Sequence, residues 1–277
     1  MRRLRISAIS YLNTAPLMWD FDYGDAGSQF EISFTVPSRC AEALRTNAAD
    51  IGIIPAAAYA TIPDLVVLPR IAIASRRAVR SILLLSKVPL EQIRTVALDT
   101  SSMTSVALTK VLFAKFWGGG RTFHSMPPDI DAMLKQHDAA LLIGDPALRA
   151  DRFRYYTFDL AEEWNRFTGK PFVFAFWAVR QDALHEAPSL DLAAIFQRSR
   201  DLGLWPRSIN EIAFKWAPRV GLREDQVRSY LTENIHYELD PGCLEGLHLF
   251  YRYAVEIGAL PPAPELCFLG AANAAIV

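Results

Sequence analysis

The chain has 277 residues, of which 51% are hydrophobic and 21% are charged. It can bury one large core or two smaller ones, and this composition excludes a disordered or fibrous protein. The 29 Lys and Arg nearly balance the 30 Asp and Glu, so a net charge of −1 gives no general attraction for nucleic acid or an anionic membrane. An anionic ligand must therefore be bound by a local group of residues.

In the first part of the chain, short β-rich runs alternate with helical patterns, which predicts a parallel or mixed sheet covered by helices. The sequence predicts a helix over 37–47, a helical turn over 56–60 and a loop over 10–17. Strands are expected at residues 4–9, 30–36, 50–54, 66–68, 71–74 and 79–85.

A second cycle of strands and helices begins near Thr95. Strands are expected at residues 96–99, 139–144, 155–158 and 172–179, with an edge segment after the glycines at 118–120. Helices are expected at residues 102–117 and 145–149. From about Leu190 the pattern is helical, with candidates at 190–202, 209–216, 224–234 and 243–257, before an irregular tail.

The simplest assembly of these elements is an α/β fold of two lobes. Lobe one is expected to hold residues 1–90 and 178–277, and lobe two residues 91–177. Two connections then form a hinge, and the cleft between the lobes is the expected binding site.

The cysteines and histidines show no metal-ligand spacing. Cys40, Cys243 and Cys267 are far apart without a CxxC pair, and the five histidines form no HExxH motif. We expect no disulfide framework and no metal site.

The first residues, MRRLRISAIS, lack the uninterrupted apolar stretch of a secretory signal peptide. No window reaches the ~18 uncharged apolar residues that span a bilayer. We expect a cytoplasmic protein that binds a small molecule rather than nucleic acid or a membrane. Its oligomeric state stays open.

Hydroxyl side chains gather where a helix follows a strand that ends at Asp99. The helix opens with TSSMTSVALTK, which contains Ser101, Ser102, Thr104 and Ser105. Backbone N–H groups and the positive end of the helix dipole meet at such a position, so it suits an anion. Ordinary N-capping is the alternative, but capping needs only one hydroxyl, so we favour anion binding. No phosphate-binding GxxxxGK[ST] pattern is present.

Two further strand ends carry polar residues. The segment ISYLNTAPL places Tyr11, Asn13 and Thr14 directly after the first strand, where α/β sheets bind ligands. A simple turn at Asn13 and Pro16 explains the segment equally well. Gly144 and Asp145 lie at another junction of strand and helix, where the Asp145 carboxylate is more simply explained as a helix cap than as a ligand contact.

Several motifs, taken together, carry a resemblance that covers residues 4 to 180. In chain order they are SYLNTAPL, AEALRTNAADIGIIPAAAY, VRSILLLS, LDTSSMTSVALTKVL, DAALLIGDPAL and DLAEEWNRFTGKPFVFAFWAVR. They resemble the chorismate dehydratase family of the futalosine route to menaquinone.

This resemblance implies a fold similar to type II periplasmic solute-binding proteins, with a two-strand hinge. It also implies a carbon–oxygen lyase that converts chorismate to 3-[(1-carboxyvinyl)oxy]benzoate and water without a metal or organic cofactor. The C-terminal helices match no motif and are expected only to support the lobes.

The resemblance also implies roles for individual residues. Asn13 and Ser81 would lie at the reacting face of the ring, where they orient it and stabilise developing charge. Asp145 would contact the C4 hydroxyl. Ser102, Thr104 and Ser105 would hold one substrate carboxylate, and the remaining substrate-binding residues would be Tyr11, Thr14, Ala56, Ser101 and Gly144.

Two alternatives share this fold, because a fold does not fix a function. One is a non-catalytic solute-binding protein for a small carboxylate, which the missing export signal disfavours. The other is a ligand-sensing protein, for which no helix-turn-helix unit is evident.

Overall fold

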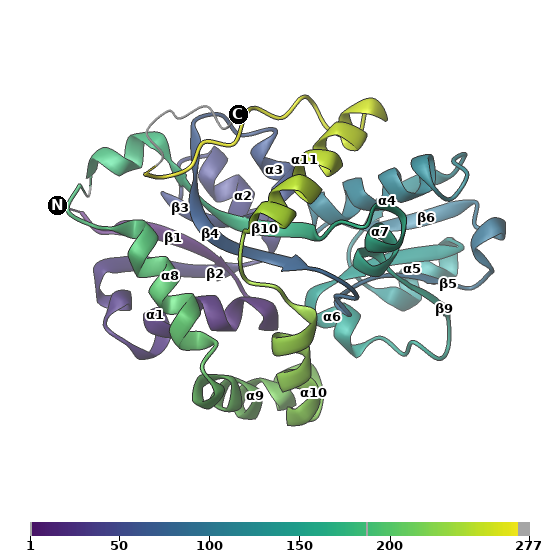
Figure 1. Ribbon diagram of the computed structural model, residues 1–277. Helices are drawn as coiled ribbons and strands as arrows, with labels where there is room; N and C mark the ends of the chain where they lie inside the picture. Colours follow the sequence, from purple (N-terminus) through teal and green to yellow (C-terminus); the bar gives the residue numbers. More distant parts are fainter. Residues whose placement is uncertain (1, 187, 271–277) are drawn as a thin grey trace.

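The computed structural model describes residues 2–186 and 188–270. Two five-stranded sheets, each flanked by helices, form the two expected lobes (Figure 1). The first sheet has the order β2-β1-β3-β10-β4 and comprises Phe30–Thr35, Leu4–Ile9, Ile51–Pro55, Phe172–Arg180 and Leu65–Ser75. The second has the order β7-β6-β8-β5-β9 and comprises Thr122–Met126, Thr95–Asp99, Ala139–Ile143, Ile82–Ser86 and Tyr156–Asp159.

In the first sheet, β1 runs parallel to β2 and β3, and β10 is inserted antiparallel between β3 and β4. Its central strands are buried on both faces, which explains their continuous apolar runs. The prediction of separate strands at 66–68 and 71–74 was wrong, because β4 continues through both. Arg70 between them has φ +66, and the pairing with β10 shifts register, so an irregularity inside one strand mimicked a turn.

In the second sheet, β6 runs parallel to β7 and β8, while β5 is antiparallel to β8 and β9. The sequence did not predict two of the helices of this lobe, α5 (Ile130–Gln136) and α7 (Leu160–Thr168). Both have an aspartate N-cap, Asp129 and Asp159, that accepts backbone N–H bonds. The other helices here are α4 (Met103–Lys115) and α6 (Gly144–Arg149).

The chain crosses from one sheet to the other at positions that differ from the expected lobe boundaries near residues 90 and 178. Residues 82–86 pair as β5 within the second sheet, and all of β10 from Phe172 pairs within the first. The crossings therefore lie at residues 76–81 and 169–171. Apolar strands of either sheet look alike in sequence, so only the pairing could locate the change.

The remaining helices come from the parts of the chain before and after lobe two. The earlier ones are α1 (Trp19–Tyr23), α2 (Pro37–Arg45) and α3 (Ala56–Tyr59), and the later ones are α8 (Leu192–Gly203), α9 (Pro206–Val220), α10 (Glu224–Ser229) and α11 (Pro241–Glu256). The helix predicted over 224–234 changes after Ser229 into a π-helical turn, Tyr230–Asn234. None of the helices within the described residues is both long and apolar enough to cross a membrane.

The C-terminal region braces the first crossing. His236 forms backbone bonds with Ala74, and the Asn234 amide donates to the Ala78 carbonyl at 3.0 Å. Further along, α11 packs against both β10 of lobe one and α4 of lobe two (Figure 1). The C-terminal helices therefore contact the hinge itself as well as the lobes.

Candidate active site

A cavity lies between the lobes, where the parallel strands of both sheets end. Lobe one contributes residues after the carboxyl ends of β1, β2 and β3, and lobe two contributes residues after β6 and β8. This is the position at which open α/β sheets bind ligands. The polar or small lining residues are Tyr11, Asn13, Ser102, Ser105 and Gly144, and the apolar lining residues include Ile9, Ile73, Ile82, Ile143 and Phe174.

The cavity is small and the lobes are closed around it. Its volume of about 40 Å³ has room for only a few water molecules. A ligand as large as a substituted six-membered ring therefore requires the lobes to separate, as hinge motion in this type of fold allows.

The expected loop after β1 is a 3-10 helix, Leu12–Met18, whose first turn forms one wall of the cavity. Asn13 is half-buried and lines the cavity. The Thr14 hydroxyl donates to Asn13 Oδ1 at 3.4 Å and lines a separate hollow of about 420 Å³ on the other side of Tyr11. The segment therefore both turns the chain and lines the cavity, so the two interpretations do not exclude each other.

The four hydroxyls at the start of α4 make different contacts. Ser102 is the N-cap and accepts from the Ser105 amide at 3.1 Å, and its hydroxyl donates to Ser105 Oγ at 3.0 Å. The Ser101 hydroxyl donates to Asp99 Oδ1 at 2.5 Å, and Thr104 Oγ1 accepts from the Ala57 amide at 3.0 Å. Capping thus accounts for one hydroxyl, and only Ser102 and Ser105 line the cavity.

The buried carboxylate of Asp99 connects two strands of lobe two. Its carboxylate accepts from the Ser101 amide at 2.8 Å and from the Ile143 amide at 3.2 Å, which ties the ends of β6 and β8 together. Burial raises the pKa of Asp99, and these hydrogen bonds oppose the rise.

Among the described residues, three backbone amides of lobe one donate hydrogen bonds to lobe two beside the cavity. The Leu12 amide donates to Asp145 Oδ1 at 3.0 Å, the Ala57 amide donates to Thr104, and the Ser38 amide donates to the Ser101 carbonyl at 3.0 Å. The interpretation of Asp145 as a helix cap was wrong, because its carboxylate makes no capping bond to α6. Burial raises the pKa of Asp145, while the Leu12 amide lowers it.

Gly144 allows the closest approach between the lobes. It has φ +63, and a Cβ there would lie 2.5 Å from Cδ2 of the Tyr11 ring. A side chain at this position is excluded both by the backbone conformation and by the ring.

Ser81 lies behind the cavity lining, completely buried at the end of the first crossing. Its Oγ accepts a hydrogen bond of 2.8 Å from the hydroxyl of Tyr230, which the sequence had assigned only to a supporting helix. Ala56 is also buried behind the lining, and its carbonyl accepts from the Tyr251 hydroxyl at 2.7 Å. Tyrosines at helical spacing look like core residues in a sequence, so no signal pointed to Tyr230.

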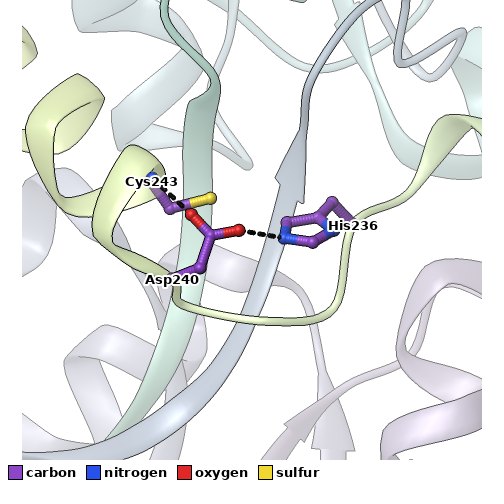
Figure 2. Close-up of side chains that lie close together, drawn as sticks. All are labelled: His236, Asp240 and Cys243. Carbon is purple, nitrogen blue, oxygen red and sulfur yellow. Dashed lines mark hydrogen bonds and ion pairs between the residues drawn. The ribbon is translucent and has the colours of Figure 1, made fainter.

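A second polar cluster lies at the hinge, away from the cavity lining. Figure 2 shows His236 Nε2 and Cys243 directed toward Asp240, with His236 Nε2 2.7 Å from Asp240 Oδ2. The three ligand atoms lie within 4.8 Å of one another, a grouping that motif spacing did not predict.

A guanidinium already balances the charge of this cluster. Arg76 donates to Asp240 Oδ2 at 2.6 Å and lies 3.4 Å from His236 Nε2, so its cation occupies the place where a metal ion would interact. Burial raises the pKa of the Cys243 thiol to about 12, which keeps it protonated. We interpret the cluster as a structural brace of the hinge.

Comparisons with known proteins agree with this architecture. A chorismate dehydratase from Thermus thermophilus is 29% identical over 282 residues, which covers 95% of this chain and 98% of that protein. A solved structure from Archaeoglobus fulgidus has a TM-score of 0.72 at 16% identity and covers 93% of this chain and 98% of that one.

The periplasmic aliphatic sulphonate binding protein from Escherichia coli has a TM-score of 0.63 at 18% identity and covers 97% of this chain and 94% of its own. These structural likenesses establish a periplasmic-binding-protein-like fold with two lobes. The profile of a family described as menaquinone biosynthesis matches residues 4–256. Since this match spans nearly all of the sequence, the chain belongs to the menaquinone biosynthesis family.

Proposed function

We propose that the protein is a chorismate dehydratase, a carbon–oxygen lyase that works without a metal or organic cofactor. Membership of the menaquinone biosynthesis family and the named activity of the Thermus relative support this proposal. The observation that carries it is the convergence of Asn13, Ser102 and Ser105 on one interlobe cavity, with Ser81 joined to the cavity lining by the Gly144 amide, which donates to the Ser81 carbonyl at 2.7 Å.

The proposed reaction converts chorismate to 3-[(1-carboxyvinyl)oxy]benzoate and water. The C3–H bond breaks and its electron pair forms the third ring double bond, while the C4–O bond breaks and the hydroxyl leaves with a proton as water. Aromatisation supplies much of the driving force. The protein must mainly orient the ring, hold its carboxylates and exclude bulk water.

Asn13 and Ser81 are proposed to orient the ring and stabilise developing charge. An amide has essentially no basicity, and a serine hydroxyl needs an activating base. We therefore assign removal of the C3 proton to the enolpyruvyl carboxylate of the substrate. Ser102 and Ser105, at the N-terminus of α4, would hold the ring carboxylate, and Thr104, whose Oγ1 accepts from the Ala57 amide, would donate its hydroxyl proton to the same carboxylate.

Asp145 is proposed to contact the C4 hydroxyl. It lies next to Gly144, which lines the cavity, and its raised pKa favours a protonated carboxyl that can donate to a departing oxygen. Tyr11, Thr14, Ala56 and Ser101 would then form or support the walls. We place the activity in the cytoplasm with a small carboxylate as the partner.

The test is to mix the purified protein with chorismate in the presence of a chelator and to follow the product by chromatography with mass detection. We expect a product lighter than chorismate by one water, with a benzoate-type ultraviolet spectrum. Asn13→Ala should lower kcat by at least about a hundredfold, because it removes an interaction made at the reacting ring. Asn165→Ala, which changes an amide in α7 outside the cavity lining, is the matched control.

The outcomes separate the alternatives. If chorismate binds and returns unchanged, the protein is a solute-binding or ligand-sensing protein. If it neither binds nor reacts, chorismate is the wrong ligand. Turnover that survives in Asn13→Ala would refute the role given to that amide.

A further inference from the structure

Tyr230 contacts a residue that lies far from it in the sequence. Its side chain is 1% exposed, and its hydroxyl donates to Ser81 Oγ at 2.8 Å. One buried hydroxyl therefore holds Ser81, a group that the proposed function places at the reacting ring.

We propose that Tyr230 is a positioning residue for the dehydration, which fixes the hydroxyl of Ser81 in the closed site. This inference rests on the proposed function. It gives the C-terminal helices a part in the chemistry, although they carry none of the motifs that point to the site.

The hydrogen bond between the two hydroxyls restricts what Ser81 can do. Each hydroxyl can both donate and accept, so the contact of 2.8 Å fixes the orientation of the Ser81 side chain whichever of the two donates. Burial raises the pKa of Tyr230, chiefly by desolvation, so the phenol stays protonated at neutral pH and cannot take a proton from Ser81 as a base. This arrangement does not activate Ser81 as a base, in agreement with proton removal by the substrate's own carboxylate.

The local backbone places the phenol for this task. Tyr230 begins the π-helical turn that follows α10, and such turns are frequent at functional sites because they redirect a side chain within a helix. The Asn234 amide at the end of the same turn holds the Ala78 carbonyl of the first crossing, three residues before Ser81. The turn is therefore fixed at both ends relative to Ser81.

A neighbouring tyrosine offers a matched control. Tyr237 is also buried, at 4% exposure, but its hydroxyl has no hydrogen-bond partner among the described residues. Packing of this region therefore does not by itself require a paired tyrosine hydroxyl. If Tyr230 were only a core residue, removal of either hydroxyl would affect turnover alike.

The experiment compares Tyr230→Phe and Tyr237→Phe with the wild-type protein in chorismate turnover, with thermal unfolding as the check on folding. Both variants keep the ring and are expected to fold. We expect Tyr230→Phe to lower kcat about tenfold or more with KM changed less than threefold, since one hydrogen bond that orients reacting groups is lost. Tyr237→Phe should keep the wild-type kcat.

A double-mutant cycle tests whether Tyr230 acts through Ser81. In the Ser81→Ala background, measured by single-turnover product formation over long times, the fractional effect of Tyr230→Phe should be several-fold smaller than in the wild type. An equal effect in both backgrounds, a wild-type kcat in Tyr230→Phe, or an equal loss in Tyr237→Phe would overturn the inference. If the wild-type protein itself does not convert chorismate, the proposed function fails instead.

Discussion

Tyr11 and Gly144 meet across the interlobe cavity with no space for a side chain between them. Tyr11 follows β1 in lobe one, and Gly144 follows β8 in lobe two, where φ +63 suits glycine. The ring of Tyr11 is thus packed against bare backbone, close to the amide of Ile143 that holds Asp99. The shape of the cavity therefore depends on the absence of a side chain at Gly144.

Gly144→Ala should lower the free energy of unfolding by about 3 kcal/mol, because it adds backbone strain and a clash with Tyr11. Gly169→Ala is the control, since Gly169 has φ +67 but nothing within 4 Å of a Cβ. It should cost only the strain, about 1 kcal/mol. Urea unfolding of both variants measures the difference, and equal losses would contradict the contact with Tyr11.

Asp145 is expected to weaken the fold at neutral pH. The pKa of Asp145 is raised in the folded protein, chiefly by burial. Its contribution to stability therefore becomes unfavourable as pH rises above about 3.9, the pKa of an aspartate in the unfolded chain. Asp145→Asn should therefore unfold at an equal or higher urea concentration than wild type at pH 7. This advantage should vanish below about pH 4, where both side chains are neutral. A variant that is less stable at pH 7 would show that the charged form is favoured.

At the scale of elements, a buried carboxylate joins the beginnings of two strands. Asp50 lies directly before β3 and accepts from the Arg5 amide of β1 at 2.8 Å, from Arg5 Nη2 at 2.8 Å and from Arg2 Nη1 at 2.6 Å. Its side chain is 1% exposed. Burial alone would raise the pKa of Asp50, but these bonds outweigh it and hold the pKa well below its usual range.

Asp50→Asn should lower the free energy of unfolding at pH 7 by about 3 kcal/mol, because it leaves two guanidinium groups without their shared buried partner. The folded pKa is depressed, so this stability is present above about pH 4 and is lost as pH falls through the folded value. Asp225→Asn breaks the exposed pair with Arg223 and should change stability by less than about 1 kcal/mol. Urea unfolding from pH 7 to pH 3 checks both, and a constant difference for Asp50→Asn would contradict the assignment.

At the scale of the whole molecule, function requires the two lobes to open and close. The backbone amides of Leu12, Ala57 and Ser38 donate across the gap, and the cavity of about 40 Å³ must expand before a ligand can enter. The C-terminal brace at Arg76, His236 and Asp240 restrains the first crossing during this motion. Opening therefore breaks a few polar bonds and leaves both sheets intact.

Hydrogen exchange should report this motion. We expect the amides of Leu12 and Ala57 to exchange by local opening, faster than the core amides of β10. The dehydration product at saturating concentration should slow exchange at the two interlobe amides and leave β10 unchanged. Mass spectrometry of peptides over 11–18, 56–60 and 172–180 provides the comparison. Equal exchange in all three peptides would indicate that the lobes move only with global unfolding.

The sequence by itself determined the fold class, most strands and the position of the cavity. The periodicity of hydrophobic residues and the apolar runs located β1, β6, β8 and β10 to within a few residues. The carboxyl ends of parallel strands lie at one edge of a sheet, which predicted the position of the cavity. The residues placed there by motif, such as Asn13 and Ser102, do line the cavity. Local chemistry is sufficient for such features, because they depend on neighbours in the chain.

Only the tertiary structure decided which strand belongs to which sheet and which distant residues touch. β5 joined the second sheet, Asp145 bonded Leu12 instead of capping its own helix, and Tyr230 reached Ser81 from 149 positions away. A hydrogen bond between such residues depends on the geometry of the whole chain and leaves no periodic pattern in either segment. The sequence therefore predicted an interlobe cavity and several of its lining residues, whereas buried contacts such as that between Tyr230 and Ser81 became visible only in the folded molecule.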